Sequence, residues 1–189
     1  MINAAVEGES DRGAVEALII AAGHDVGKVI PARGKSRLDP KIPKYSDAAR
    51  LTNWLVLRDS DGACPVELKS ELSPPQNPRF VLRIAHSMVE AWFLADAGGF
   101  AEYFHVSAGK IPRAPEELRH AKTSLLSLCA RSRSRMIRED LVAKDGKEGP
   151  LYVARLNEFA RERWDVAAAA ERSPSLARAI ASLRRLPQG

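Results

Sequence analysis

Strand-length apolar runs alternate with helix-like segments through the first half of this chain, and this alternation limits the possible folds more than any other feature. Four runs have the length and composition of strands, namely residues 2–6, 26–31, 54–57 and 80–85. Alternation of this kind is typical of a parallel sheet flanked by helices. We therefore predict an α/β fold with a mostly parallel sheet of about four strands.

The segments between these runs carry helix and loop signals. Val15, Leu18 and Ile19 recur at helical spacing in a segment that begins at Ser10 or Asp11 and stops at Gly23. Further on, the sequence predicts a Gly-, Pro- and Lys-rich surface loop over 34–44, a short helix over 45–51, a helix over 65–72 and a proline linker over 74–78.

The second half of the chain reads as helical. Helices are predicted over 87–96, 116–130, 151–164 and 173–186. The last is the best marked, because Ser173 is a favourable N-cap and Pro174 a favourable first residue. We expect a domain over 1–96 and a helical extension over 97–189 that packs on it to form one compact unit.

Composition favours a cytoplasmic protein. The 189 residues are 45% hydrophobic and 28% charged, as in ordinary globular proteins. No apolar run approaches the roughly 18 residues needed to span a bilayer, so we expect no membrane partner. Acidic residues from Glu7 onward argue against a signal peptide. The two cysteines, Cys64 and Cys129, have no metal-ligand spacing and suggest no disulfide framework.

The excess of positive over negative charge lies entirely in the second half of the chain. The net charge is +5, yet residues 1–96 hold 12 Lys and Arg against 13 Asp and Glu. The densest basic cluster is Arg131, Arg133, Arg135 and Arg138. This asymmetry suits a polyanionic partner such as nucleic acid, and a solvated helix face is the other interpretation.

Three acidic residues lie where predicted strands end. Glu7 follows the first strand, and Asp59 and Asp61 follow the third. Ligands of parallel α/β sheets lie beyond the carboxyl ends of the strands. On extended backbone, residues two apart point to the same side, so both aspartates can hold one hard cation. Mg²⁺ favours such a site, with few carboxylates and with phosphate oxygens from the substrate. An ordinary Asp-Gly turn is the alternative.

The order of these motifs resembles the TOPRIM domain of topoisomerases, primases and OLD-family nucleases. The opening Val6-Glu7-Gly8-Glu9-Ser10-Asp11 is similar to the OLD type. Later segments resemble an uncharacterised bacterial family often encoded beside AAA-type ATPases in phage-defence settings; these segments are 83–85, 89–96, 149–152 and 173–176. The resemblance implies that Glu7 is a general acid/base or metal ligand, and that Asp59 and Asp61 bind Mg²⁺ or Mn²⁺.

Glu90 and Lys122 are further candidates that the TOPRIM pattern does not cover. Glu90 lies in a segment that is apolar on almost every face, where an unpaired carboxylate is costly. It is either a fourth acid near the metal or half of a buried ion pair with Arg83 or Lys122. Lys122 is a candidate for steadying a transition-state phosphate.

These features lead to one expected function and two alternatives. We expect a Mg²⁺- or Mn²⁺-dependent nuclease that acts on nucleic acid, with DNA as the first candidate substrate and an AAA-type ATPase as a partner. The main alternative is a non-catalytic TOPRIM-like module that binds and regulates such an ATPase. A phosphohydrolase of small nucleotides is the third option.

Overall fold

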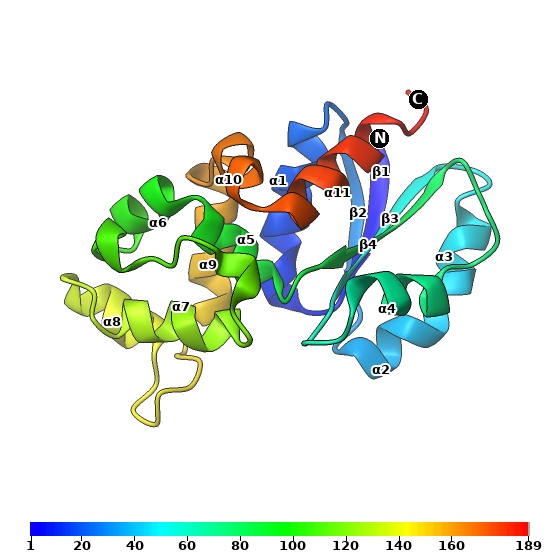
Figure 1. Cartoon of the computed structure of the whole chain (residues 1–189). Helices are drawn as coiled ribbons and strands as arrows, with labels where there is room; N and C mark the ends of the chain where they lie inside the picture. The colour runs from blue at the N-terminus through cyan, green and yellow to red at the C-terminus, as the bar shows by residue number, and fades with distance from the viewer. Residues whose placement is uncertain (189) are drawn as a thin grey trace.

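The computed structural model describes residues 1–188 and contains a four-stranded, all-parallel sheet with helices on both faces (Figure 1). The strands are β1 (Ile2–Val6), β2 (Val26–Pro31), β3 (Asn53–Asp59) and β4 (Phe80–Ala85). Their order across the sheet is β2-β1-β3-β4. The predicted α/β fold with about four parallel strands is therefore confirmed.

Both faces of the sheet are buried, and successive residues of the central strands face opposite layers. In β3, Leu55 and Leu57 belong to one core, whereas Trp54 and Val56 belong to the other. Side chains alternate between the faces of a strand, so a strand covered on both faces is an apolar run rather than an alternating one. This explains why the sequence showed β3 as a continuous apolar run.

One face of the sheet is covered by α1 (Arg12–Ala21) and α11 (Pro174–Arg184), and the other by α2 (Lys35–Leu38), α3 (Ile42–Ala48) and α4 (Pro65–Leu72). The loop predicted over 34–44 is wrong. That stretch forms α2, a 3₁₀ turn and the start of α3. The physical reason is that Leu38 and Ile42, four residues apart, are both fully buried against the sheet.

The second half of the chain consists of helices joined by longer loops than expected. The helices before α11 are α5 (Val89–Ala95), α6 (Ala97–Tyr103), α7 (Ala121–Cys129), α8 (Arg135–Leu141), α9 (Tyr152–Glu162) and α10 (Val166–Arg172). Helices α6, α8 and α10 were not predicted. The helix predicted over 116–130 begins only at Ala121, because residues 115–117 form a separate 3₁₀ turn.

A continuous apolar core joins the helical part to the sheet. Phe93, Phe100, Phe159 and Trp164 pack edge to face in this core, which extends to β1 and β3. Asn157 on α9 also binds the first half of the chain, accepting a 2.6 Å hydrogen bond from the Gly13 amide. Within residues 1–188, none of the helices is both long and apolar enough to cross a membrane.

Candidate functional site

The strand order creates a topological switch point between β1 and β3. From β1 the chain continues outward to β2 on one side, and from β3 it continues to β4 on the other. Such a point leaves a crevice beyond the carboxyl ends of the two strands, where ligands of α/β proteins bind. Glu7 directly follows β1, Asp59 ends β3, and Asp61 lies two residues further. The three predicted acids therefore lie at the same edge of the sheet, as expected.

Arg58 connects two of these acids and was not predicted as a site residue. Its side chain is only 5% exposed. Arg58 Nη1 lies 3.3 Å from Glu7 Oε2 and 3.2 Å from Asp61 Oδ2, so the two carboxylates share one nitrogen. Arg58 Nε also donates to Asp39 Oδ1 at 3.1 Å. A lone arginine in the otherwise buried apolar strand β3 is the sequence signal that identifies it.

Asp59 has a strongly raised pKa and one carboxylate oxygen that is free to bind a ligand. Its Oδ1 accepts a 3.1 Å hydrogen bond from the Val89 amide at the start of α5. Its other carboxylate oxygen receives no hydrogen bond from residues 1–188. Burial raises the pKa of Asp59 well above its usual range, and the nearby carboxylates of Asp11 and Glu90 raise it further. Burial is thus a larger cause of this shift in pKa than the crowding of acids.

Glu7 shows the same tendency to a smaller degree. Burial raises its pKa, Arg58 acts in the opposite direction, and Asp61 raises it again. Asp61 lies nearer to solvent and forms a 2.9 Å ion pair with Lys35 at the start of α2. The edge of the site thus exposes a lysine beside an aspartate, while Glu7 and Asp59 are half-buried.

Asp11 is a fourth acid of the site, and the sequence indicated it only as a possible start of the first helical segment. It is 6% exposed, and its Oδ2 accepts a 2.7 Å hydrogen bond from the Gly8 amide. Burial raises the pKa of Asp11 to about 7; the Gly8 amide lowers it, and Glu90 and Glu7 raise it. The available signal was the spacing of Glu7 and Asp11, which a single turn folds back into one cluster.

Glu90 is buried and held by two partners from the helical part. Tyr152 Oη donates to Glu90 Oε1 at 2.7 Å, and Lys122 Nζ lies 3.5 Å from the same oxygen. Lys122 also pairs with Glu148 at 2.9 Å. The ion-pair interpretation is therefore confirmed for Lys122, whereas Arg83 binds Ser182 instead. Glu90 nevertheless raises the pKa of Asp11 and Asp59, so it belongs electrostatically to the acidic site.

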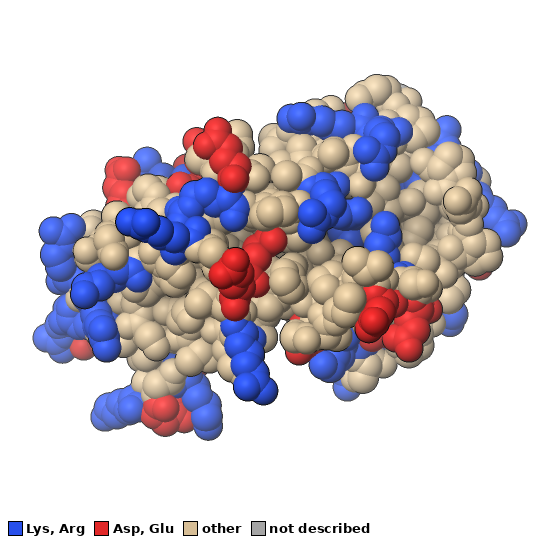
Figure 2. All heavy atoms as spheres, in the orientation of Figure 1, with Lys and Arg blue, Asp and Glu red and all other residues tan. Residues whose placement is uncertain are grey.

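The predicted arginine cluster lies at the end of the helical part remote from the sheet, with Arg131 and Arg133 between α7 and α8 and with Arg135 and Arg138 in α8 (Figure 1). Arg131 and Arg133 are exposed and form no side-chain hydrogen bond within residues 1–188. Arg135 pairs with Glu139 at 2.7 Å, and Arg138 donates to the Ser132 carbonyl. Figure 2 shows many basic side chains over this end of the molecule. Two of the four arginines are thus free to contact a ligand.

The chemistry of the donor set fits a hard divalent cation. Every candidate ligand is a carboxylate oxygen, which Mg²⁺ and Mn²⁺ prefer. Within residues 1–188, no three His, Cys, Asp or Glu side chains form a ready-made metal cluster. Mg²⁺ is usually held by one or two carboxylates together with water and substrate phosphates. The unbonded oxygen of Asp59 is the best single ligand, and sharing of one cation by Glu7, Asp59 and Asp61 stays a prediction.

Comparison with known proteins gave no match to a family model, a curated protein or a solved structure.

Proposed function

We propose that this protein is a Mg²⁺- or Mn²⁺-dependent enzyme of phosphodiester chemistry, and specifically a nuclease with a TOPRIM-like domain. The observation that carries the proposal is the position of acids at the switch point: Glu7, Asp59 and Asp61 lie at the carboxyl ends of β1 and β3, and Arg58 bridges Glu7 and Asp61. The charges of Asp11 and Glu90 also act on Asp59. Carboxylates that share a buried site repel one another, and a bound cation removes this cost.

The residues of the site have distinct roles in this proposal. Asp59, Asp61 and Glu7 would hold the cation, which when bound supplies Lewis-acid polarisation of a phosphoryl oxygen. Glu7 is suited to proton transfer, because its pKa lies above the usual range of a glutamate. Lys35 and Lys122 flank the acids and provide positive charge for the phosphate oxygens. Tyr152 and Lys122 keep Glu90 oriented toward the site.

Nucleic-acid binding is assigned to the exposed basic surface around α8. Arg131 and Arg133 have free guanidinium groups, and Arg135 forms only an exposed ion pair, which contributes little to stability and opens readily. Contacts of this kind neutralise phosphates without reading sequence. In this proposal, an AAA-type ATPase partner would present the strand to the acidic site.

A cleavage assay with two matched aspartate variants tests the proposal. The purified protein is incubated with plasmid DNA or RNA and Mn²⁺, with and without an AAA-type ATPase of the kind proposed as its partner. We expect Asp59→Asn to reduce the rate of cleavage by about a hundredfold or more, because it removes the negative charge of a metal ligand while it keeps the shape of the side chain. Asp47→Asn is the control, since Asp47 is exposed and pairs only with Arg50, and it should change the rate less than twofold.

A second variant separates binding from chemistry. Replacement of Arg131, Arg133 and Arg135 by alanine should weaken nucleic-acid binding and make its salt dependence shallower, because fewer counterions are released. Cleavage at saturating substrate should persist in part. Absence of Mn²⁺-dependent cleavage by the wild-type protein with its partner present would contradict the nuclease proposal and favour the non-catalytic module.

A further inference from the structure

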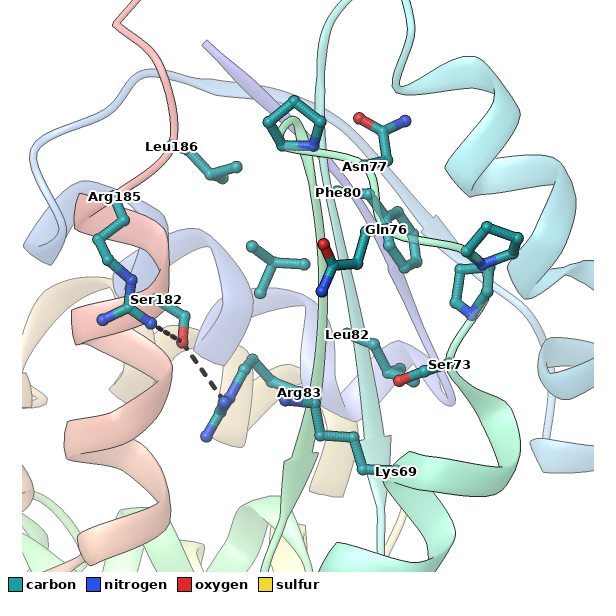
Figure 3. Close-up of a pocket in the computed structure, with 14 residues that line it drawn as sticks. Lys69, Ser73, Gln76, Asn77, Phe80, Leu82, Arg83, Ser182, Arg185 and Leu186 are labelled. Carbon is teal, nitrogen blue, oxygen red and sulfur yellow. Dashed lines mark hydrogen bonds between the residues drawn. The ribbon is translucent and has the colours of Figure 1, made fainter.

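The open edge of β4 forms the floor of a groove that lies apart from the acidic site. β4 is the last strand of the sheet, and Figure 3 shows its edge between α4 on one side and α11 on the other. The groove encloses about 680 Å³, a volume typical of small-molecule sites. None of the residues that line it belongs to the acidic site.

Three basic side chains from three elements converge at one end of this groove. Lys69 comes from α4, Arg83 from β4, and Arg185 is the C-cap residue that follows α11 (Figure 3). Arg83 Nη1 and Arg185 Nη2 both donate to Ser182 Oγ, at 3.3 and 3.2 Å. The serine hydroxyl therefore holds two guanidinium groups side by side, although like charges repel.

This positive charge is not neutralised by the protein. Within residues 1–188, Lys69, Arg83 and Arg185 form no ion pair with a carboxylate. Arg83 Nε is buried and has no hydrogen-bond partner there. Burial lowers the pKa of Lys69, and Arg83 and Arg185 lower it further. Burial likewise lowers the pKa of Arg83. An anion would supply the missing acceptors and relieve the repulsion.

The other end of the groove has a different character. Phe80 is half-buried and provides apolar surface beside the buried Leu82 and Leu186, and Gln76 lies over it with its amide group directed into the groove (Figure 3). A ligand that fills both ends needs a compact group with multiple negative charges joined to a largely apolar body with hydrogen-bonding edges. A phosphate meets the first requirement better than a single carboxylate, because it offers several acceptor oxygens to paired guanidinium groups.

We propose that the groove along β4 binds a nucleoside phosphate, with the phosphates at Lys69, Arg83 and Arg185 and the base toward Phe80 and Gln76. This site goes beyond the proposed nuclease activity and does not depend on it. Its ligand contacts the protein through fixed cations rather than through a bound metal, so binding should persist when divalent cations are removed.

Isothermal titration calorimetry of the full chain in EDTA tests this proposal with ADP as the probe. We expect ADP to bind at least tenfold more tightly than adenosine, and Arg185→Ala to weaken ADP binding about tenfold or more. Arg184→Ala is the matched control, because Arg184 is next to Arg185 in the chain but is exposed and does not line the groove; it should change the dissociation constant less than twofold.

Three outcomes would overturn the proposal. They are the absence of ADP binding at millimolar concentration, equal effects of Arg184→Ala and Arg185→Ala, and tighter binding of a tetraglutamate peptide than of ADP, which would indicate an acidic protein partner. Lys69→Ala provides a second variant that keeps α11 intact in case Arg185→Ala fails to fold. If the protein showed no cleavage activity, these binding results would not change. The nuclease proposal and the proposal of a nucleoside-phosphate site can therefore be refuted independently.

Discussion

At the scale of single residues, the site is defined as much by Arg58 and Asp11 as by the three acids that the sequence indicated. Glu7, Asp59 and Asp61 were predictable because each follows the end of an apolar run, and strand ends meet at one edge of a parallel sheet. Arg58 and Asp11 were not, because their roles depend on burial. Burial is a property of the assembled fold, and a polar residue in a local pattern gives only an indirect sign of it.

The pKa of Asp11 leads to a prediction about stability and pH. In the unfolded chain Asp11 loses its proton near its ordinary pKa of 3.8, whereas in the folded protein it does so at about 7. The folded state therefore holds an extra proton between these values, and its stability falls as the pH rises through that window. The asparagine of Asp11→Asn cannot lose a proton in this range, so the part of the pH-dependent loss of stability that is due to Asp11 should disappear in the variant.

The measurement is urea unfolding of the metal-free protein at pH 5 and pH 8. Between pH 5 and pH 8, we expect the free energy of unfolding of the wild-type protein to fall by at least about 1 kcal/mol more than that of Asp11→Asn, because one pKa unit corresponds to about 1.4 kcal/mol. The charged groups that face Asp11 are Glu7, Asp59, Glu90 and Lys122, and they remain in both proteins. An equal loss in both proteins would show that Asp11 is not the group that titrates.

At the scale of elements, the sequence predicted those whose ends carry strong local signals. Helix α4 and strand β4 occur with the predicted bounds, and α11 begins after the predicted cap at Ser173. The missed helices α6, α8 and α10 are seven residues each, shorter than the roughly 11–18 residues over which an apolar helical pattern can be recognised. Their stability comes from packing on the core rather than from their own sequence.

The cap of α11 is the element-scale prediction. Ser173 Oγ accepts a 3.3 Å hydrogen bond from the Leu176 amide and donates to Glu116, so it joins this helix to the loop before α7. Ser173→Ala should lower the free energy of unfolding by about 1–2 kcal/mol. Ser107→Ala is the control, because Ser107 precedes a 3₁₀ turn without capping it, and less than about 0.5 kcal/mol is expected. Similar losses in both variants, measured by urea unfolding, would argue against the cap.

At the scale of the whole molecule, the acidic site depends on contacts between the two halves of the chain. Glu90 faces acids from the first half while Lys122 and Tyr152 from the helical part hold it in place. The shared core makes this possible, since it runs from β1 and β3 into α5 and α9. The sequence predicted a helical extension packed on the sheet and indicated Lys122 from it as a site residue, but it did not indicate Tyr152, because no local pattern encodes contacts between residues 62 positions apart.

The central claim is that the acids at the switch point hold a divalent cation. The most direct measurement is the anomalous difference density of a crystal soaked in Mn²⁺. The account predicts a peak at the carboxyl ends of β1 and β3, within bonding distance of Asp59 and of at least one of Glu7 and Asp61, which Asp59→Asn abolishes. A map without a peak there, in crystals that diffract well enough to show bound Mn²⁺, would contradict it.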